Sequence, residues 1–167
     1  MEVGDTVKAQ KTNVMRLLEQ KKIAYTAHEY PHGDEAVDGM TVAEICGQPP
    51  ERVFKTLVAR GADKSILVFV IPVCRELDLK KAAKAAKEKS VAMIHVSEIT
   101  DLTGYVRGGC SPIGMKKQYA TFFDASASEK DTIMVSAGKI GYQVELSPES
   151  LAALTRGKFA DLVTENE

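Results

Sequence analysis

Residues 52–60, RVFKTLVAR, predict the strand from which the rest of the fold can be worked out. Their Val, Phe, Thr and Leu side chains favour extended backbone, and Gly61 ends the run. Side chains alternate along a strand, so Lys55 shares one face with the apolar Val53 and Leu57. Such a lysine is either an edge-strand residue whose charged head reaches water or a functional group in a cleft. The strand alone leaves both interpretations open.

A second predicted strand, residues 66–72, follows the turn GADKS, and the two strands should form a central hairpin. Other strands are predicted at 24–30, 91–96, 119–124, 132–138 and 142–146, with a terminal strand or turn at 158–163. Helices are predicted at 12–22, 41–47, 76–90, 97–104 and 147–155. The predicted helix starts are a Thr41/Glu44 capping box, Asp78, Ser97, and Ser147 followed by Pro148. Together these elements predict a mixed α/β domain whose short strands curl around one core.

The chain has 167 residues, enough for one full core, and we expect a loose tail at 1–11 and a single domain at 12–167. Its net charge of −1 argues against a general nucleic-acid binder, although a local basic face remains compatible with it. No apolar run reaches the roughly 18 residues of a membrane span, and the first residues lack the apolar core of a signal peptide. The expected location is the cytoplasm, without membrane contact.

The cysteines and histidines form no metal-ligand pattern. No C-x-x-C pair occurs, and an odd number of cysteines without an export signal fits reduced thiols. We therefore expect neither a metal nor another cofactor. The residues concerned are Cys46, Cys74, Cys110, His28, His32 and His95.

Two glycine-rich stretches can bring backbone close to a ligand: RGGCSPIG at 107–114 and VSAGKIG at 135–141. Each also fits a purely structural role, the first as a tight loop and the second as a hairpin turn. Cys110 lies in the first loop, but no histidine is tied to it by a recognisable pattern, so a bystander is favoured over a nucleophile. The predicted helix at 76–90 offers either a solvated face or a phosphate contact through Lys80, Lys81, Lys84, Lys87 and Lys89.

Four separated motifs resemble the YbaK/EbsC family of aminoacyl-tRNA deacylases, which is related to the editing domain of prolyl-tRNA synthetases. The motifs are FKTLV (54–58), LDLKKAAK (77–84), TGYVRGGCSPIG (103–114) and VSAGKIG (135–141), and the resemblance extends over residues 12–165. It implies a mixed α/β fold with a curled, largely antiparallel sheet and flanking helices. It also implies a substrate: the acceptor end of a mischarged tRNA, bound without a cofactor.

The resemblance assigns roles to individual residues. Lys55 matches the family's essential lysine, whose ammonium would hold the substrate and stabilise developing negative charge. Tyr30 matches a tyrosine of the pocket, and Gly108 a glycine whose backbone meets the aminoacyl group. The other residues expected to bind substrate are Thr56, Gly109, Ser111, Ser136 and Gly138.

The implied reaction removes cysteine from Cys-tRNA(Pro), with Cys-tRNA(Cys) as a further candidate substrate. In such family members the substrate's own thiol attacks its ester and forms a cyclic thiolactone, which suits a protein without a nucleophile of its own. Two alternatives stay open: a deacylase for another small residue such as alanine or serine, and a non-catalytic binding module. Prolyl-tRNA synthetase is a possible partner by the same resemblance, and the sequence does not predict an oligomeric state.

Overall fold

Strands β2 (Phe54–Gly61) and β3 (Ile66–Pro72) form the antiparallel hairpin that the sequence predicts, with Lys55 opposite Ile71. The computed structural model describes residues 11–33 and 35–165, so most of the predicted tail lies outside the described residues. On one side of the hairpin, β2 pairs with β4 (Val91–Met93). On the other side, β3 pairs with β5 (Ala120–Asp124), and β5 pairs with β8 (Lys158–Ala160). The result is a five-stranded sheet in the order β4-β2-β3-β5-β8.

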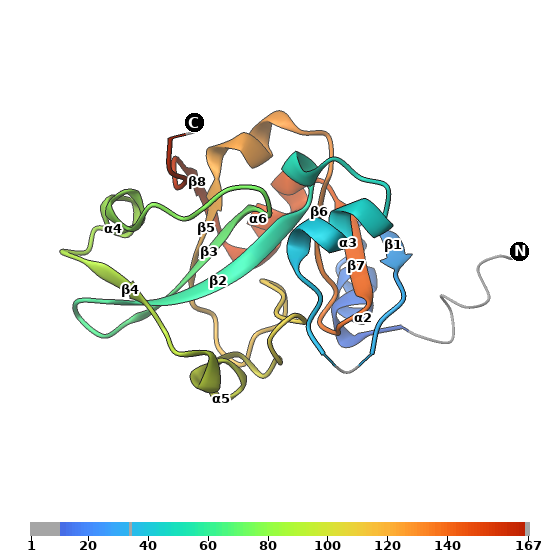
Figure 1. Ribbon diagram of the computed structural model, residues 1–167, viewed down its shortest axis with the longest axis horizontal. Coiled ribbons are helices and arrows are strands. Elements are labelled where there is room, and N and C mark those ends of the chain that lie inside the picture. The colour runs from blue at the N-terminus through green and yellow to red at the C-terminus, as the bar shows by residue number, and fades with distance from the viewer. Residues whose placement is uncertain (1–10, 34, 166–167) are drawn as a thin grey trace, which may run out of the picture.

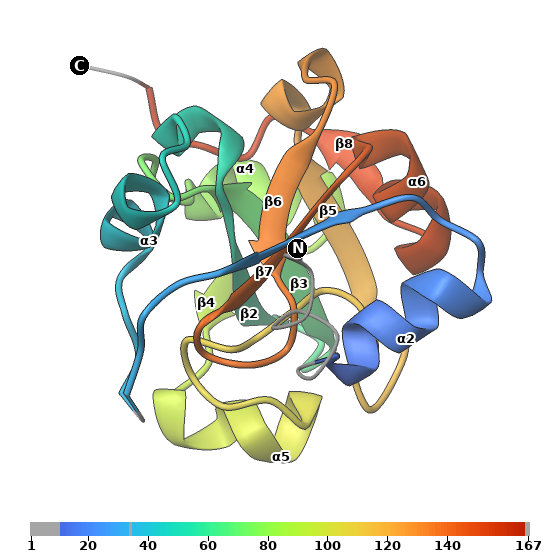
Figure 2. The same ribbon diagram turned by 90° about the vertical axis from the view of Figure 1, so that its right-hand side faces the viewer.

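A second, three-stranded sheet is entirely antiparallel and has the order β1-β7-β6. Its strands are β1 (Thr26–Glu29), β6 (Ile133–Ser136) and β7 (Tyr142–Leu146). A single β-bridge between Val53 and Met134 joins it to the hairpin. Figures 1 and 2 show the two sheets lying against each other. The mixed α/β, largely antiparallel prediction is confirmed, although the strands divide between two sheets and the pairs β3–β5 and β5–β8 are parallel.

Strand β3 is buried on both faces, which explains its continuous apolar sequence ILVFVIP. Val68 and Val70 point into a core shared with helices α2 (Asn13–Gln20) and α6 (Pro148–Thr155). Phe69 and its alternate neighbours point the other way, into a core covered by α4 (Leu79–Ala86). The alternation along one strand therefore builds two cores, one on each side of the larger sheet.

Two of the predicted helix starts are confirmed. The Asp78 carboxylate accepts hydrogen bonds from the backbone N–H groups of Lys80 and Lys81 at the start of α4. Ser147 accepts one from Ser150 at the start of α6, where Pro148 occupies the first turn. Helix α4 is shorter than predicted, because it ends where Lys87 adopts a left-handed conformation.

The other two predicted starts are wrong. Helix α3 (Gly39–Ile45) begins at Asp38, whose carboxylate accepts hydrogen bonds from both the N–H and the hydroxyl of Thr41, each at 2.9 Å. Thr41 is thus a donor to the cap, because the carboxylate is the stronger acceptor. Ser97 lies inside a 3₁₀ turn, η2 (Val96–Glu98), which begins at His95 and leads into α5 (Ile99–Thr103). The remaining short turns are η1 (Pro50–Arg52) and η3 (Ala125–Glu129).

Among the described helices, none is both long and apolar enough to cross a bilayer.

Candidate active site

A cleft of about 710 Å³ opens where the two sheets separate. Val53, just before β2, forms a parallel β-bridge with Met134 of β6. Beyond this bridge the two segments run in the same direction without pairing. Residues a few positions further along each strand therefore face each other across a gap. Val53, Phe54 and Val73 give the cleft an apolar lining near the bridge.

Strand β2 presents an unpaired edge to this cleft. The Val53 carbonyl accepts from Val73 on the β3 side, whereas the Val58 carbonyl accepts from Ile94 on the opposite side. Backbone groups alternate along an antiparallel strand, so the N–H and C=O of Thr56 also point away from β3. β4 pairs with β2 only from Ala59 onward, which leaves Thr56 at the open edge. The Thr56 hydroxyl oxygen is buried and has no hydrogen-bond partner among the described residues.

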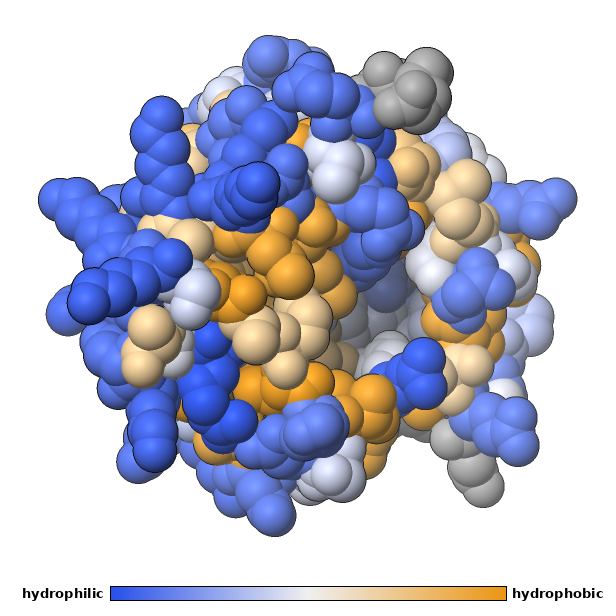
Figure 3. Space-filling view, turned by 60° about the vertical axis from the view of Figure 1, so that its left-hand side comes forward, coloured by the Kyte–Doolittle hydropathy of each residue, from blue (hydrophilic) through white to orange (hydrophobic). Residues whose placement is uncertain are grey.

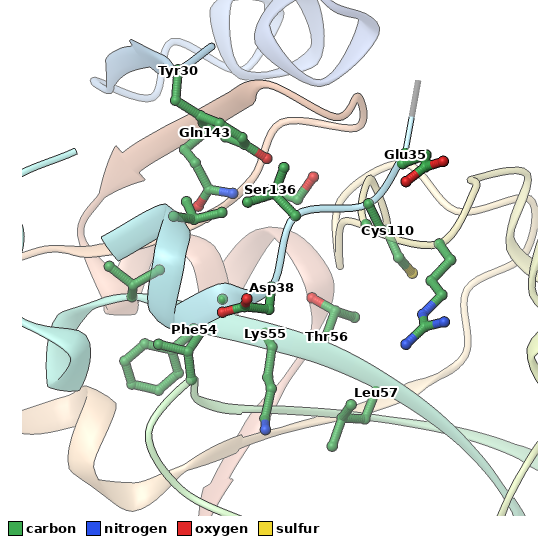
Figure 4. A pocket seen from close by; sticks show the side chains of 18 residues that line it. Tyr30, Glu35, Asp38, Phe54, Lys55, Thr56, Leu57, Cys110, Ser136 and Gln143 are labelled. Atoms are coloured by element: carbon green, nitrogen blue, oxygen red, sulfur yellow. The ribbon is translucent and has the colours of Figure 1, made fainter. Parts of the chain in front are cut away.

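Lys55 also lines this cleft, although its side chain lies on the opposite face of β2 from that of Thr56. Figure 4 shows Lys55 and Leu57 on one side of β2 and Thr56 on the other. The Lys55 side chain is half-buried, and it makes no ion pair within the described ranges. A cation that lacks an anionic neighbour is available to an anionic or polarised group of a ligand.

The three-stranded sheet supplies the facing wall through Ser136 and Gln143, and Tyr30 joins them from the position directly after β1 (Figure 4). Burial raises the pKa of the Tyr30 phenol, although a hydrogen bond with the Gly141 backbone partly opposes the shift. Ser136 lies opposite Gln143 in the β6–β7 register, and its hydroxyl accepts a hydrogen bond from the Gly138 N–H at 3.1 Å. Gln143 is only 6% exposed, and its Oε1 atom has no partner in the part of the chain that the structure describes.

Residues 35–38, here called the roof segment, line the cleft and pack closely against Gly108. A Cβ atom added to Gly108 would lie 2.6 Å from the Cβ and 2.9 Å from the Cα of Ala36, and the φ of Gly108 is +88°. Glycine is therefore required at position 108 for two reasons: the close approach of Ala36 and the positive φ angle. Glu35 and Asp38 of the roof segment contribute carboxylates to the lining, and Arg107 contributes a guanidinium.

Cys110 also lines the cleft, but its thiol is poorly suited to attack a substrate. Burial raises its pKa to about 11, with a hydrogen bond to Thr103 acting weakly in the other direction. The thiolate is the reactive form, and it is scarcely populated near neutral pH. This environment agrees with the interpretation of Cys110 as a bystander.

The surface is hollowed on the face shown in Figure 3, where hydrophobic residues gather along one side of the hollow and hydrophilic residues surround them.

Within the described ranges no group of three histidine, cysteine, aspartate or glutamate side chains could hold a metal ion.

The cleft brings together five of the expected site residues: Tyr30, Lys55, Thr56, Gly108 and Ser136. The other three lie outside its lining. Gly109 packs against the backbone of Lys139, fully buried Ser111 accepts a hydrogen bond from Ile113, and Gly138 has a φ of +96° in the β6–β7 turn. Their visible roles are in shaping the two glycine-rich stretches.

Sequence reasoning missed Glu35, Asp38, Arg107 and Gln143. For Gln143 a usable signal existed. If VSAGKIG is a hairpin turn, its register pairs residue 143 with Ser136, as the structure shows. The other three lie in loops or at a loop–helix junction, where no periodic pattern predicts orientation.

A family model described as the aminoacyl-tRNA editing domain matches residues 35–154, which include most of the cleft lining. This chain is a member of the aminoacyl-tRNA editing domain family. The resemblance to the YbaK/EbsC deacylases is thereby confirmed, and sequence relatives extend it over nearly the whole chain. EbsC of Enterococcus faecalis, named as a candidate Cys-tRNA(Pro)/Cys-tRNA(Cys) deacylase, is 48% identical over 155 residues, which are 93% of this chain and 94% of EbsC.

Solved structures share the editing-domain fold at low sequence identity. A candidate trans-editing enzyme for prolyl tRNA synthetase superposes with a TM-score of 0.78 at 22% identity, covering 91% of this chain and 95% of that one. The hypothetical protein APE2540 superposes with a TM-score of 0.83 at 19% identity, covering 92% of this chain and all 100% of its own.

Proposed function

We propose that this protein is a trans-editing deacylase that removes cysteine from Cys-tRNA(Pro), with Cys-tRNA(Cys) as a second substrate. The observation that carries the proposal is the 48% identity to EbsC over nearly the full length of both chains. The cleft supports it with a cation, Lys55, beside an unpaired strand edge and an apolar lining of Val53, Phe54 and Val73. The proposed location is the cytoplasm, where aminoacyl-tRNAs are used.

The chemistry follows from what the cleft offers. The substrate thiol attacks its own ester carbonyl, a C–S bond forms, the C–O bond to the tRNA breaks, and the thiol proton passes to the departing ribose oxygen. A tethered nucleophile gains an effective molarity of roughly 10⁵ M or more when it is well oriented. Lys55 stabilises the negative charge that develops on the oxygen atoms. The protonated Cys110 thiol takes no part, since its pKa is raised to about 11.

The substrate-binding residues in this proposal are Tyr30, Thr56, Gly108 and Ser136, with Lys55 as the catalytic group. Gly109, Ser111 and Gly138 would act by holding the loop and the turn in place. Prolyl-tRNA synthetase is the proposed partner, because the near-zero net charge of the chain gives it little general attraction for tRNA.

The test is a deacylation assay of the purified protein on tRNAs charged with cysteine, alanine, serine or S-methylcysteine. Cysteinyl-tRNA should be cleaved quickly and seryl-tRNA much more slowly, although the two differ by one atom. The S-methylcysteine ester should resist cleavage and still compete for binding. A cyclic thiolactone should appear by mass spectrometry before free cysteine.

The other outcomes identify the alternatives. Rapid cleavage of alanyl-tRNA or of the methylated ester would mean attack by water and a different amino-acid preference. Tight binding without cleavage of any ester would mean a non-catalytic module.

A further inference from the structure

Two oxygen atoms in the cleft are buried without a hydrogen-bond partner. They are Thr56 Oγ1 and Gln143 Oε1, and among the described residues no other buried side-chain nitrogen or oxygen atom is left in this state. Both residues line the same cavity, from opposite walls. Burying an unpartnered polar atom destabilises a folded chain, so a pair of them in one cleft indicates a ligand group that completes them.

The chemistry of the two atoms restricts that group. The amide oxygen of Gln143 can only accept a hydrogen bond, and the Thr56 hydroxyl accepts as well as donates. The Thr56 carbonyl at the open edge of β2 adds a third acceptor, beside the Thr56 N–H, which can donate at the same edge, as the alternation of the strand's hydrogen bonds indicates. The carboxylates of Glu35 and Asp38 line the same cavity and balance the charges of Lys55 and Arg107, although Asp38 also caps α3 through Thr41. A group with several donors and a positive charge fits this set best.

An aminoacyl ester carries one such group. Its ester oxygens only accept, and its thiol is a weak donor, whereas its α-ammonium has three donors and a positive charge. We propose that Gln143 and Thr56 form the receptor for the α-ammonium group, and that this contact restricts the protein to aminoacyl esters with a free amine. Esters whose amine is acylated, as in a peptidyl-tRNA, are rejected. The inference rests on the proposed function and adds a recognition rule to it.

Binding tests the receptor independently of turnover. The probes are cysteine joined through an amide to 3′-amino-3′-deoxyadenosine, and the matching compound that lacks the amine. Calorimetry on the wild-type protein should show the free-amine probe binding at least about tenfold more tightly, since hydrogen bonds to a charged group are strong. The preference should weaken above pH about 8, where an α-amine loses its proton.

Three variants assign the contact to Gln143. Gln143→Leu should bind both probes equally, and its Tm should be no lower than that of the wild type, because the change removes a buried polar atom without a partner. Gln143→Glu should keep the preference, since a carboxylate only accepts. Gln118→Leu is the matched control, because the Gln118 amide donates to the Thr155 carbonyl outside this cleft.

Equal binding of the two probes by the wild type would overturn the receptor, and so would an unchanged preference in Gln143→Leu. Loss of the preference in both Gln143→Leu and Gln143→Glu would show that the amide acts through its N–H groups as a donor, which also contradicts the proposal. Turnover on cysteinyl-tRNA and N-acetylcysteinyl-tRNA tests the recognition rule. Cleavage of both esters at equal rates would refute the rule, whereas failure to cleave either ester despite a normal probe preference would refute the proposed function alone.

Discussion

Lys55 stands on a strand among apolar neighbours, and its ammonium lacks an anionic partner in the described ranges. Lys55→Ala should lower kcat/KM on cysteinyl-tRNA by about 10²–10³-fold, the usual effect of removing a group that stabilises transition-state charge. Lys55→Arg should lower kcat/KM as well, because a planar guanidinium does not replace a compact ammonium. Single-turnover deacylation measures both effects, and circular dichroism confirms that the variants fold. Activity of Lys55→Ala within threefold of the wild type would remove Lys55 from the mechanism.

Gly108 and Cys110 are two residues apart on one loop, yet they should respond very differently to alanine. The new Cβ at position 108 meets the backbone of Ala36, and a φ of +88° disfavours any side chain. Gly108→Ala should therefore displace the roof segment and lower kcat/KM by more than about tenfold. Cys110→Ala removes a protonated thiol and should stay within about threefold of the wild type. An inactive but folded Cys110→Ala would instead identify Cys110 as the nucleophile.

At the scale of an element, the lysines of α4 and its C-terminal end fall into two groups, one that is ion-paired and one that is exposed. Lys81 is bound to the C-terminal segment, with its ammonium 3.1 Å from Asp161 and 3.0 Å from Glu165. Lys80, Lys84 and Lys87 are exposed and make no ion pair among the described residues. The lysine-rich sequence of this helix therefore combines a structural anchor with a face that is open to a partner.

Changing Lys80, Lys84 and Lys87 together to alanine should raise KM for tRNA and leave kcat unchanged. Each lost phosphate contact lowers the salt dependence of binding, so the slope of log KM against log salt should fall by about 2. A triple variant of Lys21, Lys117 and Lys158, which are exposed lysines away from α4, controls for the change in net charge. If both triple variants show the same KM and slope, α4 does not contact tRNA specifically.

Across the whole molecule, the elements were easier to predict than the cleft between them. The hairpin 52–72 and the Asp78 and Ser147 caps follow from local patterns, because alternation and capping act over a few residues. The cleft depends on the Val53–Met134 bridge, which connects residues far apart in the sequence and leaves no local signal. Expectations for Lys55, Thr56 and Ser136 came from motif resemblance, and Gln143 was missed because its burial depends on the tertiary arrangement.

The three-stranded sheet carries a pH-dependent contact. Glu145 accepts a hydrogen bond from the Thr132 hydroxyl at 2.5 Å and lies 2.8 Å from His28. The Thr132 hydrogen bond, followed by His28, lowers the pKa of Glu145 below its ordinary value of 4.5. A lowered folded-state pKa adds stability that is fully present above pH 4.5 and is lost as the pH falls through the lowered value.

Thr132→Val should therefore lower the free energy of unfolding at pH 7, and its difference from the wild type should shrink below pH 4.5. Urea titrations at several pH values measure both. Thr100→Val, at an exposed position on α5, is the control and should differ from the wild type by the same small amount at every pH. A difference for Thr132→Val that stays constant down to the acid transition would show that Glu145 does not titrate through this contact.

The single β-bridge between the two sheets also affects how the protein opens locally. With only Val53, just before β2, and Met134 of β6 paired, separating the two strands breaks few backbone hydrogen bonds, and what opposes it is the apolar core that Phe54 and Val135 share. In the empty protein, amide protons of the two sheets should therefore exchange with deuterium as separate units. A ligand seated against Lys55 on one wall and Gln143 on the other ties these units together. Saturation with the amide-linked cysteinyl adenosine should slow amide exchange in both sheets at once. A ligand in the cleft would then make the two sheets unfold as one cooperative unit.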